Sequence, residues 1–192
     1  MQLTQDTPDL AAYLAADDII DHQHPLVRAT ADRLRSEAPG PYAYAEAAFT
    51  FVRDAVPHSS DSGDPRVSVR ASEVLATRNG ICHAKAHALV ALLRAEATPA
   101  GLCYQKLDVV HGLIACLLPG RKHWARLDPR GNKEGVDARF GLDREQLAWP
   151  VRPELGEADY GHVHAAPHPA VLAAFVQATD SSRLLELLPT EL

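Results

Sequence analysis

The sequence predicts an α+β fold of 192 residues, in which helices come first and an antiparallel sheet follows. Three observations predict this fold. Apolar residues recur at helical spacing through the first part of the chain. A central segment without glycine or proline is apolar nearly all round, which indicates a buried helix. Apolar extended segments, separated by turn residues, come directly after it.

Length and composition fit one globular domain. Hydrophobic residues make up 46% of the chain and charged residues 23%, which is an ordinary globular composition. A chain of this length can bury a full core without disulfides or metals. We expect a single domain over residues 1–192, made of an N-terminal helical part, a core, and a loop-rich C-terminal part with a final helix: residues 1–60, 70–132 and 133–192.

Three N-terminal helices are predicted from the spacing of apolar residues, over 8–20, 25–38 and 42–55. In the second of these, we expect Leu26, Ala29 and Leu34 to face inward. Residues 58–68 consist largely of serine, aspartate, glycine and proline, so this stretch is predicted to be a surface loop.

The central helix is predicted over residues 81–96, and Thr98-Pro99 ends it. Before it, Ser72 is placed to cap a short helix that reaches Thr77. The Asn79-Gly80 pair then predicts a tight turn immediately before the central helix.

Three extended segments predict the sheet, over residues 101–107, 110–118 and 123–128. Between the second and third, residues 119–122 (Pro-Gly-Arg-Lys) suit a four-residue hairpin loop. The chain is then rich in loop residues until Pro169, and apolar spacing over 170–188 predicts a final helix. Its leucines are expected to be exposed and to offer a contact surface: Leu184, Leu185, Leu187 and Leu188.

Charge and hydropathy argue against two classes of partner. The net charge is −6 and the basic residues do not cluster, so we expect no nucleic-acid partner. No stretch approaches the ~18 consecutive apolar residues of a membrane helix, and the N-terminus lacks a signal-peptide pattern. We therefore expect a cytoplasmic protein without a membrane partner, in a reducing compartment.

Cys82 is the cysteine placed for chemistry. It lies at the predicted start of the central helix, where the helix dipole stabilises a thiolate and lowers the thiol pKa. The free N–H groups of the first turn can also hold a developing oxyanion. Cys103 and Cys116 fall within apolar strand segments, where we expect them in the core.

His111 and Asp128 can supply the base and the orienting carboxylate that a thiolate nucleophile needs. With residues 119–122 as the hairpin loop, Leu113 lies opposite Asp128, and His111 shares a face with Leu113. Such diagonal neighbours are roughly 7–8 Å apart at Cα, within reach of a hydrogen bond between their side chains. A slip of one residue in this register would put the two on opposite faces.

The order of these features resembles the transglutaminase-like superfamily. The resemblance spans about residues 72–131, and its motifs are Asn79-Gly80-Ile81-Cys82, Leu92-Leu93-Arg94-Ala95, Thr98-Pro99-Ala100, His111, Pro119-Gly120, Trp124 and Leu127-Asp128-Pro129. It implies a papain-like core, in which the helix bearing the nucleophile packs on an antiparallel sheet with further helices around it. It also implies that Cys82 is the nucleophile, His111 the general base and acid, and Asp128 the residue that orients the imidazole.

Two positions depart from the family pattern. The family often has His-Ala-Trp where this chain has His111-Gly112-Leu113, which removes an aromatic wall of the cleft. An aromatic residue commonly follows the family's cysteine, whereas His83 follows it here. Neither departure removes a member of the triad. The side-chain oxyanion donor that papain-like enzymes usually add has no counterpart that we can place from the sequence.

The resemblance implies a thiol-dependent acyl-transfer enzyme that acts on a peptide or small amide and needs no cofactor. A thioester on Cys82 would be resolved by water, which is hydrolysis, or by an amine, which is transamidation. We favour hydrolysis, because small bacterial members of the family resemble proteases or amidases more than protein cross-linkers. Transamidation stays open, as does a non-catalytic domain that binds peptides or partners on the same fold.

Histidines outside the triad give a further hypothesis, a metal site. His83 and His87 are four residues apart, the spacing of zinc ligands on a helix, but no glutamate lies between them to act as general base. We interpret them as polar positions on the flank of the helix and predict no metal. His162, His164 and His168 form a patch in a proline-rich loop, where they could line a cleft or bind a metal.

Overall fold

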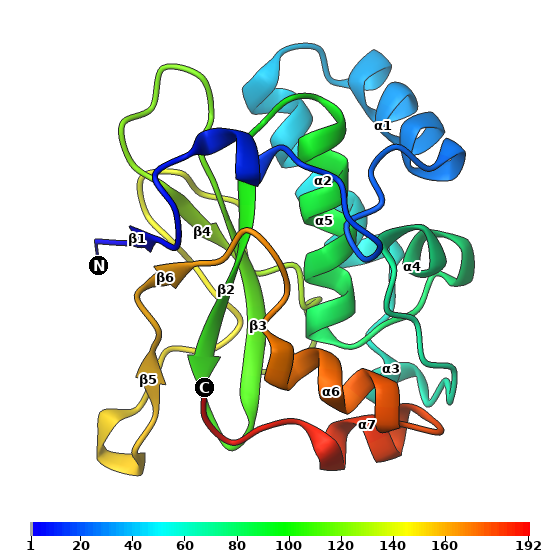
Figure 1. Ribbon diagram of the computed structural model, residues 1–192, viewed down its shortest axis with the longest axis vertical. Helices are drawn as coiled ribbons and strands as arrows, with labels where there is room; N and C mark the ends of the chain where they lie inside the picture. The colour runs from blue at the N-terminus through cyan, green and yellow to red at the C-terminus, as the bar shows by residue number, and fades with distance from the viewer. Residues whose placement is uncertain (1) are drawn as a thin grey trace.

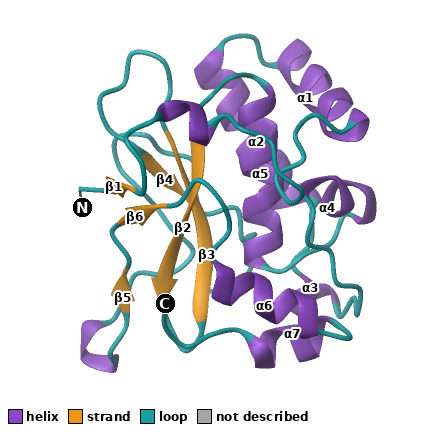
Figure 2. Cartoon of the chain, viewed as in Figure 1, coloured by secondary structure: helices purple, strands orange, loops and turns teal. Residues whose placement is uncertain are grey.

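The computed structural model describes residues 2–192 and has a sheet on one side and helices on the other (Figures 1 and 2). The main sheet has four antiparallel strands in the order β4-β3-β2-β5. Their bounds are β2 Ala100–Lys106, β3 Val110–Cys116, β4 Ala125–Leu127 and β5 Ala158–Asp159. A smaller parallel pair joins β1 (Thr4–Gln5) to β6 (His162–Val163). The fold is α+β, as predicted.

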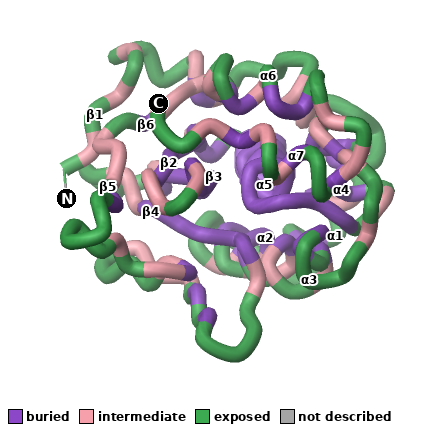
Figure 3. Tube along the Cα trace, turned by 90° about the horizontal axis from the view of Figure 1, so that it is seen from below, coloured by how far each residue is buried: buried purple, intermediate pink, exposed green. Residues whose placement is uncertain are grey.

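Helix α5 (Cys82–Ala95) forms the centre of the molecule, and all its residues are buried. It packs on β2 and β3 on one side and against α1, α2 and α4 on the other. Figure 3 shows it enclosed by other segments of the chain. Most residues of α5 are apolar, as a helix buried on every side requires. Replacing a buried leucine with alanine lowers the free energy of unfolding by about 2–5 kcal/mol. No helix within residues 2–192 is long and apolar enough to cross a membrane.

Two long cations on α5 are buried and tie neighbouring segments to it. Arg94 donates to the carbonyls of Ala100, Ala15 and Ala165, which lie on three different segments. Lys85 donates to the carbonyl of Val56 just after α2, and burial lowers its pKa to about 7. Each cation satisfies backbone carbonyls that would otherwise be buried without a donor.

The two faces of the main sheet have separate cores. The face toward α5 belongs to the large core, which includes Tyr104 and Ile114. The opposite face carries a smaller cluster with Cys103 and Leu113, covered by Tyr13 from the N-terminal segment. Cys103 and Cys116 are buried in the sheet, as predicted.

The N-terminal helices are α1 (Pro25–Glu37) and α2 (Pro41–Ala55), close to the predicted bounds. The predicted inward face of α1 is wrong in part. Leu34 is buried, but its partners are Val27 and Ala31, while Leu26 and Ala29 are exposed. The helix presents the smaller Val27 to the core because α1 packs closely against α4 and α5.

Residues 8–20 do not form the predicted helix. A short 3-10 helix over Leu10–Tyr13 is all that forms there. Asp17 then accepts hydrogen bonds from the backbone N–H groups of Ile19 and Ile20, at 2.7 and 2.6 Å. A side chain that bonds the backbone in this way competes with the helical hydrogen-bond pattern.

The segment before α5 also differs from the prediction. Helix α3 (Ser59–Ser62) lies within the predicted loop, and α4 spans Ala71–Thr77 with Ser72 inside it rather than at its cap. Asp21, from a distant segment, accepts the N–H of Ser72 at 3.0 Å. The positive φ of the turn falls on Arg78 (51°), and Gly80 serves close packing, because a Cβ there would lie 2.9 Å from Ala84 Cβ.

The predicted final helix is two helices, α6 (Pro169–Gln177) and α7 (Ser181–Leu187), after a 3-10 turn over Pro153–Leu155. Asp180 caps α7 by accepting from Arg183 N at 2.9 Å, and the Ser181 hydroxyl donates to Asp64 O at 2.7 Å. These two contacts fix a bend between the helices. The leucines near the end of the predicted final helix were predicted to be exposed, but Leu184 and Leu188 are buried and the other two are half-buried.

Candidate active site

Cys82 is the first residue of α5, and its side chain is 7% exposed at the wall of a cavity. Ile81 precedes the helix in an extended conformation. Because isoleucine has no polar side-chain atom, it cannot cap the N–H groups of the first turn. The sulfur therefore lies beside free backbone donors and the positive end of the helix dipole.

His111 on β3 and Asp128, just after β4, lie side by side as the hairpin geometry predicts. The register pairs Ile114 with Leu127, and continuing it by one pair places Asp128 opposite Leu113. The His111 Nε2 atom donates to Asp128 Oδ2 at 2.9 Å. The predicted register is therefore the one observed. The hairpin connection is longer than predicted, because β3 ends at Cys116 and β4 begins at Ala125.

Asp128 is fully buried and held by three hydrogen bonds. Besides His111, the backbone N–H groups of Arg130 and Ala148 donate to it, at 3.1 and 2.9 Å. Because the carboxylate cannot rotate, it fixes the imidazole with its Nε2 proton on the carboxylate side. The remaining ring nitrogen of His111, Nδ1, is the one available to exchange a proton with Cys82.

The sulfur and the His111 imidazole shift one another's protonation. Burial raises the pKa of the Cys82 thiol, but the charges of His83 and His111, with hydrogen bonds from His111 and His58, hold it well below its usual value. Burial lowers the pKa of His111, but Asp128 and the Cys82 thiolate outweigh it and leave that pKa raised. The two shifts act together, so the pair favours the thiolate and imidazolium forms over the neutral thiol and imidazole.

A cavity of about 510 Å³ opens next to Cys82 and His111. Trp149 forms one wall, with its ring edge-on to His111 at 5.2 Å between centroids, and the Arg130 guanidinium lies over the Trp149 ring at 5.3 Å. Leu185 and Leu188, from α7 and its C-terminal end, form another wall. Trp149 thus has a position in the cleft, whereas Trp124 packs edge-on against Tyr13.

Two imidazoles beside the sulfur, those of His58 and His83, were not among the predicted site residues. His83 is buried, and its Nδ1 lies 3.4 Å from Cys82 Sγ. A Cβ at Gly112 would lie 2.7 Å from the His83 ring, so the glycine leaves the space that the ring fills. The two departures from the family pattern are therefore coupled in space. His58 lines the cavity together with Cys82.

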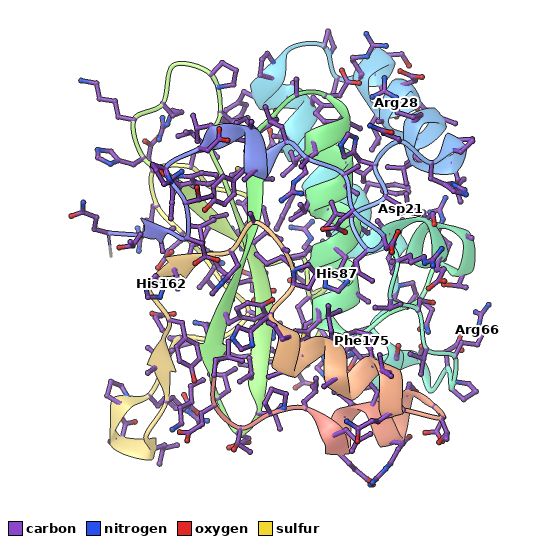
Figure 4. The ribbon with its side chains drawn as sticks, viewed as in Figure 1. Asp21, Arg28, Arg66, His87, His162 and Phe175 are labelled. Atoms are coloured by element: carbon purple, nitrogen blue, oxygen red, sulfur yellow. The ribbon has the colours of Figure 1, made fainter. Side chains whose placement is uncertain are left out.

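His83 and His87 were predicted to lie on a polar flank of the helix, and this is wrong because both are buried. His87 is covered by α6. Its Nδ1 donates to Val69 O at 2.8 Å, its ring lies 6.0 Å from that of Phe175, and burial lowers its pKa to about 4 (Figure 4). Within residues 2–192, no group of three or more histidine, cysteine, aspartate or glutamate side chains is arranged to hold a metal ion.

The later histidines have contacts of other kinds. His162 lies on β6 at the edge of the molecule opposite the helices, as Figure 4 shows. His164 pairs with Asp6 at 2.8 Å, and His168 caps α6 by accepting the N–H of Ala170 at 3.3 Å. The His164–Asp6 pair joins the C-terminal part to the N-terminal segment, whereas the His168 contact is a local cap of α6.

The sequence model of the transglutaminase-like superfamily matches residues 28–129, which is more than half of the chain and includes Cys82, His111 and Asp128. The chain belongs to the transglutaminase-like superfamily. A comparison with curated proteins gives no match.

Solved structures of this superfamily's fold resemble the chain. One is a candidate cysteine protease from Cytophaga hutchinsonii, with a TM-score of 0.54 and 19% identity over 65% of this chain and 43% of that one. Another is the periplasmic domain of TgpA from Pseudomonas aeruginosa, with a TM-score of 0.50 and 22% identity over 64% of this chain and 48% of that one. The chain thus matches less than half the length of each, and the likeness shows a shared papain-like α+β core.

Proposed function

We propose that this protein is a thiol-dependent acyl-transfer enzyme that hydrolyses an amide or peptide bond. The observation that carries the proposal is the geometry around Cys82. A thiol at the start of a buried helix lines the same cavity as an imidazole, and a fully buried carboxylate orients that imidazole. This arrangement supplies a nucleophile, a proton carrier and an orienting group in one cleft, as nucleophilic acyl transfer requires.

The reaction proceeds in two halves. The Cys82 thiolate attacks the carbonyl carbon, a C–S bond forms, and the carbonyl electron pair moves to oxygen. When the oxyanion collapses, the C–N bond breaks and His111 Nδ1 gives its proton to the leaving nitrogen. Water then attacks the thioester while His111 takes a proton from it, and the acid leaves as the Cys82 thiolate is restored. Asp128 keeps the same imidazole orientation in both halves.

The walls of the cavity favour an apolar acyl group. Val110, Leu185 and Leu188 line it, and the charged side chains of Arg130, Arg152 and Glu157 on its walls are held in ion pairs. Arg130 pairs with Asp61, and Arg152 pairs with Glu157. A charged acyl group that displaced a partner from one of these pairs would cost free energy, because Arg130 and Glu157 are buried.

Detection of an acyl-enzyme on Cys82 tests this proposal. The purified protein is mixed with p-nitrophenyl esters of apolar acids and with matching anilides, and its intact mass is followed with time. We expect a mass increase of one acyl group that disappears in Cys82→Ala and persists in Cys116→Ala, the matched control. Acid as the product in the presence of an added primary amine supports hydrolysis, and the amide as the product shows transamidation. Wild-type protein that takes up no acyl group contradicts the proposal.

A further inference from the structure

His58 is held next to the nucleophile by the backbone. It forms a parallel β-bridge with Gly80, the second residue before Cys82. The N–H of Ser59 donates to Gly80 O at 3.3 Å, and the N–H of Gly80 donates to Pro57 O at 3.4 Å. The side chain is 7% exposed and lines the same cavity as Cys82 and His111. The distance between His58 and the sulfur is therefore set by rigid main-chain contacts rather than by a flexible loop.

The tautomer of His58 follows from its other contact. Its Nδ1 accepts the backbone N–H of Ser60 at 3.2 Å, at the start of α3. A ring nitrogen that accepts cannot also carry the proton, so the hydrogen of the neutral ring is on Nε2. His58 is thus a hydrogen-bond donor at a fixed position in the cleft. It differs in this from His111, whose Nε2 proton is directed at Asp128.

A donor beside the sulfur is also a donor beside the oxyanion. Negative charge lies on Cys82 Sγ before attack, and it moves to the carbonyl oxygen, which is bonded to the carbon that the sulfur has attacked. His58 and Cys82 line the same cavity, and a hydrogen bond from His58 is one of the effects that lower the pKa of Cys82 against the effect of burial. Backbone N–H groups of the first turn of α5 supply further donors to the oxyanion.

We propose that His58 is a catalytic residue that donates its Nε2 hydrogen to the oxyanion formed when Cys82 attacks an acyl substrate. This inference rests on the proposed acyl-transfer function and names the side-chain donor that the sequence left unplaced. The role transfers no proton, because His58 keeps its hydrogen while the oxyanion forms and collapses. His83, which also touches the sulfur, has a different position, because its ring packs against Gly112 and Tyr104.

Two variants of His58 separate donation from structural capping. In His58→Asn, the amide oxygen can replace Nδ1 as acceptor of the Ser60 N–H, but the side chain is too short to replace Nε2. In His58→Gln, the longer amide places an N–H near the position of Nε2 and weakens the cap. If His58 only caps α3, the asparagine variant should keep more of the acylation activity. If His58 donates to the oxyanion, the glutamine variant should keep more of it.

The experiment compares acylation with alkylation in wild-type, His58→Asn and His58→Gln proteins. Acylation by a p-nitrophenyl ester or anilide forms an oxyanion, whereas alkylation by iodoacetamide occurs at a saturated carbon and forms none. We expect His58→Asn to lower the acylation rate constant about 100- to 1,000-fold, with the loss in kcat rather than KM. His58→Gln should recover at least about tenfold of it. Alkylation, measured at a pH where the thiol is fully ionised, should change only a few-fold.

Three outcomes overturn the inference or the function beneath it. If the His58→Asn protein is acylated as fast as the wild type, or if it retains more activity than His58→Gln, the donor role is wrong. If alkylation falls as much as acylation, His58 acts on the thiolate alone, and the acyl-transfer proposal stands without it. If iodoacetamide alkylates the wild-type protein quickly but no substrate acylates it, the acyl-transfer proposal itself fails. Circular dichroism and thermal melting of each variant show whether it is folded.

Discussion

Cys82 and Cys116 are both buried cysteines, but their pKa values are shifted in opposite directions. Inside the sheet, burial raises the pKa of Cys116 to about 12. At the start of α5 the thiol is buried as well, yet its pKa is held well below the usual value by the imidazoles around it. Burial by itself makes an inert thiol. The difference shows that the lowered pKa of Cys82 depends on its position at the helix end and on the charged partners that reach it.

The largest expected effect is the difference in turnover between the Cys82→Ala and Cys116→Ala variants. We expect Cys82→Ala to lower acyl-transfer turnover by at least about 10,000-fold, because the covalent route is lost. Cys116→Ala should leave turnover within a few-fold and lower stability by about 1 kcal/mol, from the small cavity left in the sheet. Steady-state kinetics and chemical denaturation of both variants measure the two effects. Equal losses of turnover would show that Cys82 has no special role.

Neutralising the orienting carboxylate should have the next largest effect. Asp128→Asn keeps the shape of the side chain, but it removes the charge that holds the Nε2 proton of His111 and supports its imidazolium form. We expect kcat to fall about 100- to 10,000-fold, with a smaller change in KM. The pH above which turnover declines should also shift downward, because the raised pKa of His111 depends on Asp128. A variant with wild-type kcat and pH profile would remove Asp128 from the site.

Filling the space beside His83 should have the smallest effect, which is mainly on stability. Gly112→Ala places a methyl group 2.7 Å from the His83 ring, so the ring or the strand must move. We expect a loss of about 1–3 kcal/mol in the free energy of unfolding, measured by denaturant titration. The double variant with His83→Ala should recover much of that loss. If Gly112→Ala is as stable as the wild type, the coupling of the two positions is wrong.

Local sequence patterns were sufficient to predict the centre of the fold. The apolar residues all round 81–96 require a buried helix, and the hairpin loop sets the register that brings His111 to Asp128. Both are consequences of short-range rules, the helical and strand periodicities and the turn that joins two strands.

Contacts between distant segments account for what the sequence did not predict. The bend between α6 and α7 depends on a hydrogen bond from Ser181 to Asp64. The position of His58 depends on its bridge to Gly80, and the serine- and aspartate-rich residues after it indicated an ordinary loop. The inward face of α1 was ambiguous because alanine, valine and leucine occupy adjacent positions, so packing against α4 and α5 decides it.

The pH dependence of Cys82 alkylation shows whether His111 and Cys82 form a thiolate–imidazolium pair. We expect a thiolate that reacts with iodoacetamide well below the ordinary thiol pKa of ~8.5, and that loses reactivity as pH falls through the lowered pKa. In His111→Ala the imidazolium is gone and burial remains, so the transition should move upward by at least one pH unit, which corresponds to about 1.4 kcal/mol. Wild-type alkylation that titrates at or above ~8.5, or that is indifferent to His111, would contradict the account.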